Sequence, residues 1–281
     1  MKITVWGCRG TLPTPGQHTL KYGGNTTCLE IRNRAGFLTI VDAGSGIRYL
    51  GKSIMQEKNV AEMCLMLTHS HWDHLMGFPF FIPAYFSRFK INVCGVQSAR
   101  NYMSQSLARQ LEAPYFPVNF DQLKANFNFS CKGPGCERCN HMKVESINLS
   151  HPNGGFGFSF SENNRRFVFL TDNELGYQHP DGLLPKDYVE FARDADLLFH
   201  DAQYTEEDMV KTRSWGHSTY AEALDLAIRA NVKKLGLFHH DPDRTDNEID
   251  QMVSELQAKA ATRSSQLEVF AVYEGMQIEL E

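Results

Sequence analysis

The sequence predicts an α/β protein in which two packed mixed sheets carry helices on their outer faces, an αββα sandwich. Short apolar runs that end in polar clusters recur in both halves of the chain, and turns or helices follow several of them. Two capping boxes, Thr219–Glu222 and Thr245–Glu248, each mark the start of a helix. No repeat or flexible linker divides the chain, so we expect residues 1–281 to form a single domain.

The expected strands follow one another along the chain with turns between them. The first third is rich in β-forming residues around a hairpin turn at Asn33–Gly36, and a turn at Glu274–Gly275 separates the last two strands. The runs that we assign to strands are Lys2–Gly7, Thr27–Arg32, Phe37–Val41, Met63–Thr68, Phe167–Thr171, Asp196–His200, Leu235–His239, Leu267–Tyr273 and Met276–Leu280. Their alternation with helices in both halves is what a two-sheet sandwich requires.

The composition is that of an ordinary globular protein. Hydrophobic residues make up 42% of the 281 residues and charged residues 22%, which suits a soluble enzyme with a large core. The sequence has no secretory signal pattern and no stretch of roughly 18 apolar residues. Seven cysteines, several of them among apolar neighbours, indicate reduced thiols, so we expect a cytoplasmic protein. The net charge of −5 argues against broad nucleic-acid binding, which depends on surplus Lys and Arg.

Three histidines and an aspartate lie within six residues, directly after the expected strand Met63–Thr68. An extended segment places alternate side chains on one side, so His69 and His71 can converge on one ion. The following turn brings Asp73 and His74 to a second position nearby. Imidazole and carboxylate ligands suit zinc, manganese or iron better than magnesium or calcium. The pattern therefore predicts a site for two divalent metal ions.

This His-x-His-x-Asp-His pattern resembles the signature of the metallo-β-lactamase superfamily. The resemblance implies three further ligands, each at the end of a later strand, and His151, Asp172 and His239 occupy such positions in that order. His240 competes for the last place, but family members end this strand with an apolar-x-His step, then two residues and a proline, which favours His239. The implied ligand sets are His69, His71 and His151 for one metal, Asp73, His74 and His239 for the other, and Asp172 bridging both.

Asp42–Gly46 resembles the Asp-x-Gly loop that lies beside the metals in this superfamily. The resemblance implies that Asp42 is a hydrogen-bond acceptor behind the ligands and does not itself bind metal.

Two further segments narrow the chemistry. Trp215–Thr219 is similar to the Gly-His-Ser-Thr element of the branch that contains tRNA 3′-processing endonucleases and cyclic phosphodiesterases, and it implies that His217 donates a proton to the leaving oxygen. Phe199–Ala202 resembles the His-Glu-Ala-Thr element of that branch, with Asp201 in place of Glu, and a carboxylate there would orient and charge the histidine. The alternative is that His217 only lies next to a helix cap and takes no part in catalysis.

The resemblance implies hydrolysis of a phosphodiester, in which two cations lower the pKa of a bridging water and Asp73 orients the resulting hydroxide. The tRNA enzymes carry a long arm between the third metal motif and the bridging aspartate, whereas His151 and Asp172 are only 21 positions apart here. We therefore expect a cyclic nucleotide or similar small phosphodiester as the substrate, without stable nucleic-acid binding. The alternatives are an acyl hydrolase (lactonase or thioesterase) on the same metals, an RNA-processing endonuclease, and a non-catalytic sensor.

Two other features carry weaker expectations. Cys131, Cys136, Cys139 and His141 could hold a third, structural zinc ion, or they could be free thiols or a disulfide. The aromatic groups at Phe78–Phe86 and Tyr115–Pro117 predict core packing, with a pocket wall or a dimer contact as the alternative. We expect a homodimer.

Overall fold

The structure is a computed structural model that describes residues 1–94, 100–129, 142–263 and 266–281. The chain forms two β-sheets, one of seven strands in the order β13-β1-β2-β3-β4-β5-β6 and one of six in the order β12-β11-β10-β9-β8-β7. The first sheet consists of β1 (Lys2–Gly7), β2 (Cys28–Arg32), β3 (Leu38–Val41), β4 (Glu62–Met66), β5 (Lys90–Cys94), β6 (Asn126–Asn128) and β13 (Gln277–Glu279). The second consists of β7 (Lys143–Asn148), β8 (Phe156–Glu162), β9 (Arg165–Leu170), β10 (Leu197–Asp201), β11 (Lys234–Phe238) and β12 (Glu268–Ala271).

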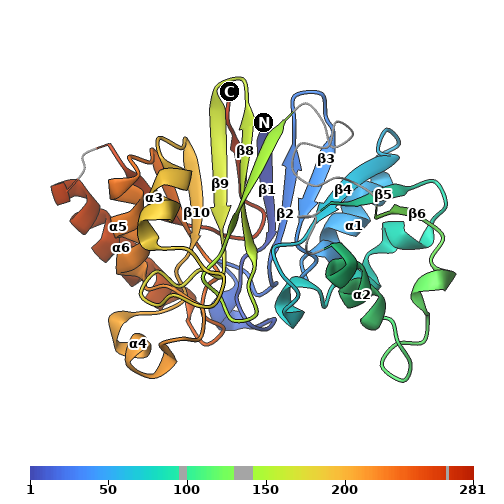
Figure 1. Ribbon diagram of the computed structural model, residues 1–281, viewed down its shortest axis with the longest axis horizontal. Coiled ribbons are helices and arrows are strands. Elements are labelled where there is room, and N and C mark those ends of the chain that lie inside the picture. Colours follow the sequence, from blue (N-terminus) through green and yellow to red (C-terminus); the bar gives the residue numbers. More distant parts are fainter. Residues whose placement is uncertain (95–99, 130–141, 264–265) are drawn as a thin grey trace.

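Helices cover the outer face of each sheet, as Figure 1 shows. They are α1 (Ile47–Gln56), α2 (Arg100–Arg109), α3 (Pro185–Ala192), α4 (Glu206–Thr212), α5 (Tyr220–Arg229) and α6 (Asp246–Arg263). Short 3-10 helices are η1 (Gln17–Thr19), η2 (Trp72–His74), η3 (Phe78–Phe80), η4 (Ile82–Tyr85) and η5 (Phe120–Gln122). None of the helices in the described part of the chain is long and apolar enough to span a membrane.

The core has three apolar layers, which confirms the predicted αββα sandwich. Successive side chains of a strand point to opposite faces of its sheet. Phe167 and Phe169 of β9 therefore pack between the two sheets, whereas Val168 and Leu170 pack beneath the helices. A third cluster joins α1 to the outer face of the first sheet. Both sheets are mixed, because antiparallel pairs such as β1–β2 and β7–β8 adjoin parallel pairs such as β3–β4 and β9–β10.

Local sequence signals explain where several elements begin and end. Both predicted capping boxes are present, since Thr219 and Glu222 exchange hydrogen bonds of 2.8 and 3.1 Å at the start of α5, and Thr245 accepts from the backbone N–H of Glu248 before α6. The β8–β9 hairpin turns at two asparagines with positive φ, the conformation that tight hairpins need.

The aromatic groups divide between core and surface. Phe78 and Phe81 are fully buried beside α1, as predicted, whereas Phe80 and Phe86 are exposed. Tyr115 is 86% exposed, so the expectation of core packing was wrong there. Its neighbour Phe116 packs against the core only in part, because the segment lies in a surface loop after α2.

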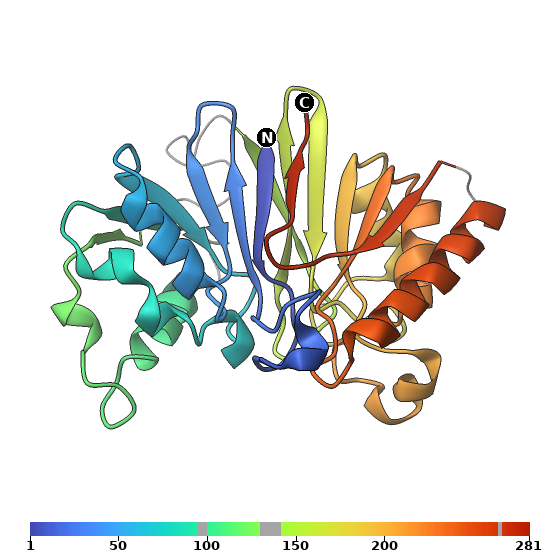
Figure 2. The same ribbon diagram turned by 180° about the vertical axis from the view of Figure 1, so that it is seen from behind.

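The sandwich brings many chain segments to one edge. Neighbouring strands β3 and β4, and likewise β9, β10 and β11, run parallel, so their carboxyl ends meet at the same side of each sheet. This is the lower edge in Figure 1, opposite the two chain termini. Figure 2 shows the loop that follows β1 at the same edge, near the start of α6. The residues expected to bind metal come from these loops.

Candidate metal centre

Three imidazoles form the first group of possible ligands. His69 and His71 follow β4, and His151 follows β7, and their ring nitrogens lie within 4.8 Å of one another. Nε2 of His151 is 2.9 Å from Nδ1 of His71. The opposite nitrogen of His151 faces the carbonyl oxygen of Gly216 at 2.9 Å, which turns Nε2 toward the group. The structure therefore brings together the three histidines that the sequence assigned to one ion.

The second group contains Asp73, His74, Asp172 and His239, whose ligand atoms also lie within 4.8 Å. Nε2 of His239 is 3.1 Å from Oδ2 of Asp73, and Nε2 of His74 is 3.3 Å from the same oxygen. All four side chains are buried. These are the residues predicted for the second ion.

Asp172 joins the two groups through different oxygens of one carboxylate. Its Oδ2 faces the first group, at 3.6 Å from Nε2 of His69 and 3.7 Å from Nε2 of His151. Its Oδ1 faces the second group, at 3.2 Å from Nε2 of His74 and 3.3 Å from Nε2 of His239. This arrangement suits a carboxylate that bridges two ions.

Hydrogen bonds behind the ligands fix their orientation. Oδ2 of Asp42 lies 2.8 Å from Nδ1 of His74, in agreement with the role expected for Asp42. Oε1 of Gln203 lies 2.9 Å from Nδ1 of His239, and the backbone N–H of Thr11 donates to Oδ2 of Asp73. Such contacts set the tautomer and direction of a metal-binding imidazole. The sequence did not predict that Gln203 or Thr11 contacts a ligand, because both approach the centre from loops that meet it only in the folded chain.

The buried polar atoms of the centre fit metal ions. Nε2 of His69 is fully buried without a hydrogen-bond partner among the described residues, and Nε2 of His74 faces only the carboxylates of Asp73 and Asp172. Leaving one such atom unsatisfied costs about 1–3 kcal/mol, which coordination to a metal would offset. The histidine and aspartate groups together fit a dinuclear metal site, although which residue binds which ion stays a prediction.

The electrostatics of the two groups differ. Burial lowers the pKa of His69 well below its ordinary value and lowers the pKa of His151 to about 3, so these imidazoles are neutral, as metal ligands must be. Burial acts in the same direction on His74, but the carboxylates of Asp172, Asp73 and Asp42 outweigh it and raise the pKa of His74 well above its usual range. The second group thus requires a positive charge, which a proton or a divalent cation can supply.

Three residues of the centre hold a left-handed backbone at the ends of strands. The φ angles are 64° at Asp42, 53° at Asp172 and 61° at His239. Such a conformation costs about 1–3 kcal/mol for a non-glycine residue and persists only where surrounding contacts impose it. It turns the chain sharply at the ends of β3, β9 and β11, where these side chains enter the centre.

Asp201 and His217 form a hydrogen-bonded pair beside the two groups. Oδ2 of Asp201 lies 2.7 Å from Nδ1 of His217, so the shorter side chain still makes the contact expected of Glu. Burial disfavours the charged imidazole, but Asp201 outweighs it and raises the pKa of His217 to about 9. The ligand atoms of His217, His151 and Asp172 lie within 4.8 Å of one another. His217 is therefore placed to exchange a proton at the centre.

The structure separates His239 from its competitor. Nε2 of His240 donates to the carbonyl oxygen of Val272 at 2.8 Å, on the far side from the two groups. The left-handed backbone of His239, just past the end of β11, turns its side chain to the centre while His240 points away toward Val272.

Glu174 organises the loop that carries His217, and sequence reasoning missed it. Its Oε1 accepts the backbone N–H of Ser214 at 2.7 Å, and its Oε2 accepts the N–H of Gly216 at 2.8 Å. Gly216 has a φ of 99°, and a Cβ there would lie 2.0 Å from Nδ1 of His151. The signal available was its place two residues after Asp172.

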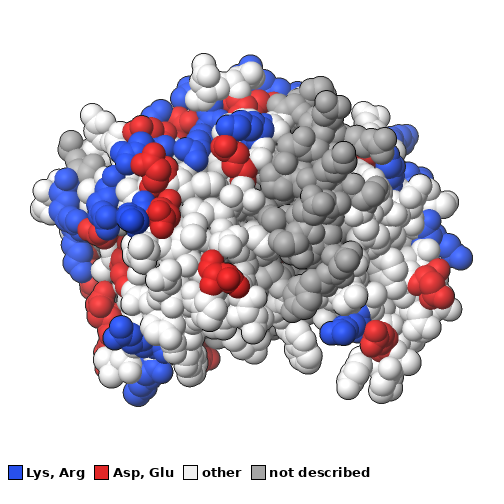
Figure 3. All heavy atoms as spheres, viewed as in Figure 1, with Lys and Arg blue, Asp and Glu red and all other residues white. Residues whose placement is uncertain are grey.

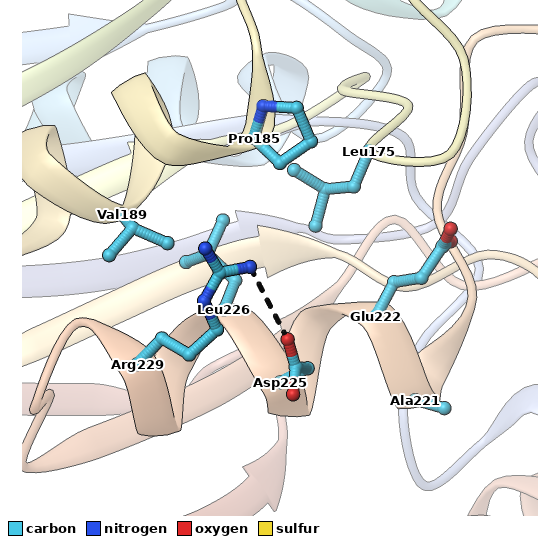
Figure 4. A pocket seen from close by; sticks show the side chains of 8 residues that line it. All are labelled: Leu175, Pro185, Val189, Ala221, Glu222, Asp225, Leu226 and Arg229. Carbon is cyan, nitrogen blue, oxygen red and sulfur yellow. Dashed lines mark ion pairs between the residues drawn. The ribbon is translucent and has the colours of Figure 1, made fainter.

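Two remaining features lie apart from this centre. A groove between α3 and α5 is drawn in Figure 4, where Arg229 pairs with Asp225 at 3.6 Å, and none of the residues of the two groups lines it. The possible zinc ligands Cys131, Cys136, Cys139 and His141 lie outside the described residues.

Comparison with known proteins places the chain among metallo-β-lactamase folds. The family model described as "Beta-lactamase superfamily domain" matches residues 40–240. A curated relative, Ribonuclease Z of Picrophilus torridus, is 22% identical over 87% of this chain and 87% of its own length. Two solved structures superpose along nearly all of both chains. The metallo-β-lactamase fold protein YhfI from Bacillus subtilis has a TM-score of 0.69, 18% identity and 99% coverage of each chain. The short form of human tRNase Z has a TM-score of 0.65, 20% identity and 100% coverage of each chain.

These relatives correct the expectation about partners. A small-molecule substrate without nucleic-acid binding was predicted, but the relatives that span most of the chain are called ribonucleases, enzymes that act on RNA. The error has a physical reason. A net charge is a sum over the whole surface, whereas binding of a polyanion depends on the cations near the site.

The family model covers well over half of the chain and includes the His69–His74 motif, His151, Asp172, His217 and His239. Its match agrees with the two-sheet fold and with the paired histidine and aspartate groups at the edge of the sandwich. The chain belongs to the beta-lactamase superfamily and is a metal-dependent hydrolase of the metallo-β-lactamase fold.

Proposed function

We propose that the protein is a metal-dependent ribonuclease that hydrolyses a phosphodiester bond of RNA. The observation that carries the proposal is the Asp201–His217 pair beside the two ligand groups, because a ribose oxygen leaves poorly unless it is protonated. Curated relatives named Ribonuclease Z support RNA as the substrate, and they span 78–92% of this chain. Cyclic-nucleotide hydrolysis was the main expectation from the sequence, but these relatives favour the RNA-processing alternative.

The proposed metals are zinc or manganese, with iron as a third candidate, because imidazole and carboxylate ligands suit these ions. When bound, two such ions would activate a water molecule and neutralise charge on the phosphate. In this proposal His69, His71 and His151 hold one ion, Asp73, His74 and His239 hold the other, and Asp172 contacts both. The separate directions of the two Asp172 oxygens support this division.

The chain's own residues have distinct roles in the proposed reaction. Asp73 accepts a hydrogen bond from Thr11, which holds its carboxylate in place to orient the attacking water. His217 carries the proton that the leaving ribose oxygen takes up. Asp201 keeps that imidazole charged, and it also accepts the backbone N–H groups of Asp172 and Ser218, which ties the acid to the bridging residue. The three roles supply orientation, protonation and positioning, respectively.

An acyl hydrolase on the same metals is the main competitor. Lactones and thioesters have less need of a separate acid, so a buried, carboxylate-supported histidine favours phosphodiester cleavage over that class.

The test is a substrate panel on purified protein loaded with manganese or zinc. It includes a precursor tRNA with a 3′ trailer, single-stranded RNA, single-stranded DNA of the same sequence, a lactone and a thioester. We expect cleavage of an RNA substrate, and we expect that chelation abolishes it. Turnover of the lactone or thioester without RNA cleavage would overturn the proposal.

A further inference from the structure

The last turn of α4 and the loop that leads to His217 carry exposed side chains that the proposed mechanism does not use. Lys211, Arg213 and Trp215 are all exposed, and Trp215 is 60% exposed although it lies two residues from the buried His217. Neither basic side chain makes a hydrogen bond or ion pair within the described ranges of the chain. We call these three residues the basic-aromatic segment.

Three acidic residues begin α4, close to this segment, and two of them are engaged by other groups. Asp208 of α4 is already engaged by Arg244 at 2.5 Å and by the backbone N–H of Thr205 at 2.9 Å. Glu206 accepts from the hydroxyl of Thr219 at 3.0 Å. Glu207, the remaining acidic residue of the first turn of α4, lies four positions before Lys211. In the described part of the chain neither Lys211 nor Arg213 forms an ion pair with it, so both cations are available to an external anion.

The segment is also held rigidly. Oε1 and Oε2 of the buried Glu174 accept the backbone N–H groups of Ser214 and Gly216, which flank Trp215 on both sides. Ser214 has a φ of 71°, a conformation that a non-glycine residue keeps only when its contacts impose it. These contacts hold the backbone on both sides of Trp215, so the base of the exposed indole has a defined position next to the loop that carries His217.

The location of the segment links it to the centre. The ring of His217, two residues after Trp215, lies 5.3 Å from that of His151 and 4.9 Å from that of His239. In Figure 1, α4 is at the lower edge of the molecule, the edge at which β9 ends. In Figure 3, Lys and Arg side chains lie over that corner.

We infer that the basic-aromatic segment binds single-stranded RNA next to the bond that is cut. In this inference Lys211 and Arg213 contact phosphates and the Trp215 indole stacks on an adjacent base, the two interactions that hold single strands in other proteins. The inference rests on the proposed ribonuclease function. It also explains how a chain with a net charge of −5 and a short connection between His151 and Asp172 holds a polyanion. Lys211 and Arg213 lie six and four positions before the acid His217, in the part of the chain that leads to it.

Binding can be measured separately from cleavage. The metal-loaded protein is titrated with a fluorescein-labelled phosphorothioate single-stranded RNA, which keeps its charge and resists hydrolysis, at several salt concentrations. Each phosphate contact contributes about 0.7 to the slope of log K against log salt for single strands, so Lys211→Ala/Arg213→Ala should flatten the slope by about 1.4. Trp215→Ala should weaken binding by about 5- to 150-fold, whereas Trp215→Phe keeps an aromatic face and should recover most of it.

A matched control uses two other exposed lysines that form no ion pair with the residues that the structure describes. Lys58 precedes β4 and Lys259 lies near the end of α6, both far from the carboxyl ends of the strands. Lys58→Ala/Lys259→Ala removes the same charge and should leave both affinity and salt slope unchanged. An equal effect of the two double variants would show that only total charge matters and would overturn the inference.

The remaining outcomes distinguish a failure of this inference from a failure of the proposed function. If the three segment variants bind RNA like the wild type while the wild type cleaves RNA, the inference is wrong and the proposed function stands. If the wild type neither binds nor cleaves RNA, both are wrong. If one variant melts at a lower temperature, the folded single variants replace it. Lys211→Ala and Arg213→Ala should each flatten the salt slope, and Trp215→Phe should lose the quenching of indole fluorescence that RNA causes in the wild type.

Discussion

Nδ1 of His217 lies 2.7 Å from Oδ2 of Asp201, and both side chains are buried at the edge where the two ligand groups meet. The pair raises the pKa of His217 to about 9 against the opposing effect of burial. An imidazole that stays protonated at neutral pH is suited to give a proton rather than to take one. This relationship separates His217 from the neutral histidines of the first group.

The first prediction concerns the role of His217 as the acid. His217→Ala should keep both metal ions and lower kcat for RNA by about 10²–10⁴-fold, the usual contribution of a positioned acid. The loss should shrink on a p-nitrophenyl phosphodiester, whose leaving group needs little protonation. Metal analysis and both assays check this. Activity on RNA within a factor of two of wild type would remove His217 from the mechanism.

The second prediction concerns the pH profile. His217 must be protonated to act, so activity should fall as the pH rises through its pKa, which Asp201 raises to about 9. Asp201→Asn removes the carboxylate and leaves burial to lower the pKa of His217, so the alkaline limb should move to lower pH. Part of the lost kcat should return on acidification.

A purely structural role for Asp201 would instead lower kcat by the same factor at every pH. Asp196→Asn is the matched control, because Asp196 precedes the same strand β10 and pairs with Lys233 at 2.7 Å. Its alkaline limb should coincide with that of the wild type.

The third prediction concerns Asp172. Because its two oxygens face different groups, Asp172→Ala should lose both ions, whereas His71→Ala should lose only one. Metal content after dialysis, measured by mass spectrometry, distinguishes the two variants. Two equivalents still bound to the folded Asp172→Ala protein would show that the carboxylate does not bridge.

The sequence predicted most of the centre because its main part is local. His69, His71, Asp73 and His74 lie in one short turn after a strand, and the family resemblance favoured His239 over His240, which is the histidine that lies with the second group. Glu174 and Gln203 could not be found in this way, since their importance depends on loops that pass close to them only in the folded chain.

The substrate was misjudged for a related reason. Whether Lys211 and Arg213 are free depends on which acidic groups are already paired, and Asp208 is engaged by Arg244, 36 positions away. Net charge carries no such information. The expected homodimer, the single domain and the zinc ion at Cys131–His141 stay predictions.

The last prediction concerns Glu174, which we expect to position both His217 and the basic-aromatic segment. Its carboxylate accepts the N–H groups of Ser214 and Gly216 and faces Nε2 of His179 at 2.9 Å. Glu174→Ala leaves the buried N–H of Gly216 without a partner, at about 1–3 kcal/mol, and releases the strained backbone at Ser214. We therefore expect a lower melting temperature, a higher KM and a lower kcat for RNA, with metal content unchanged. Glu174→Gln retains one acceptor oxygen, so it should recover part of the lost melting temperature, KM and kcat.

The control for Glu174 must lose stability without touching the loop. Glu162 is a buried carboxylate at the opposite edge of the molecule, where it pairs with the N-terminal amine at 3.1 Å and accepts the backbone N–H of Arg34 at 3.0 Å. Glu162→Ala should also melt earlier, but its kcat and KM for RNA, measured well below the melting temperature, should match those of the wild type. A role of Glu174 in positioning the loop requires that Glu174→Ala changes kcat and KM for RNA while Glu162→Ala does not. Equal kinetics in the two alanine variants would mean that Glu174 contributes stability alone, and that the position of His217 is set by Asp201 without its help.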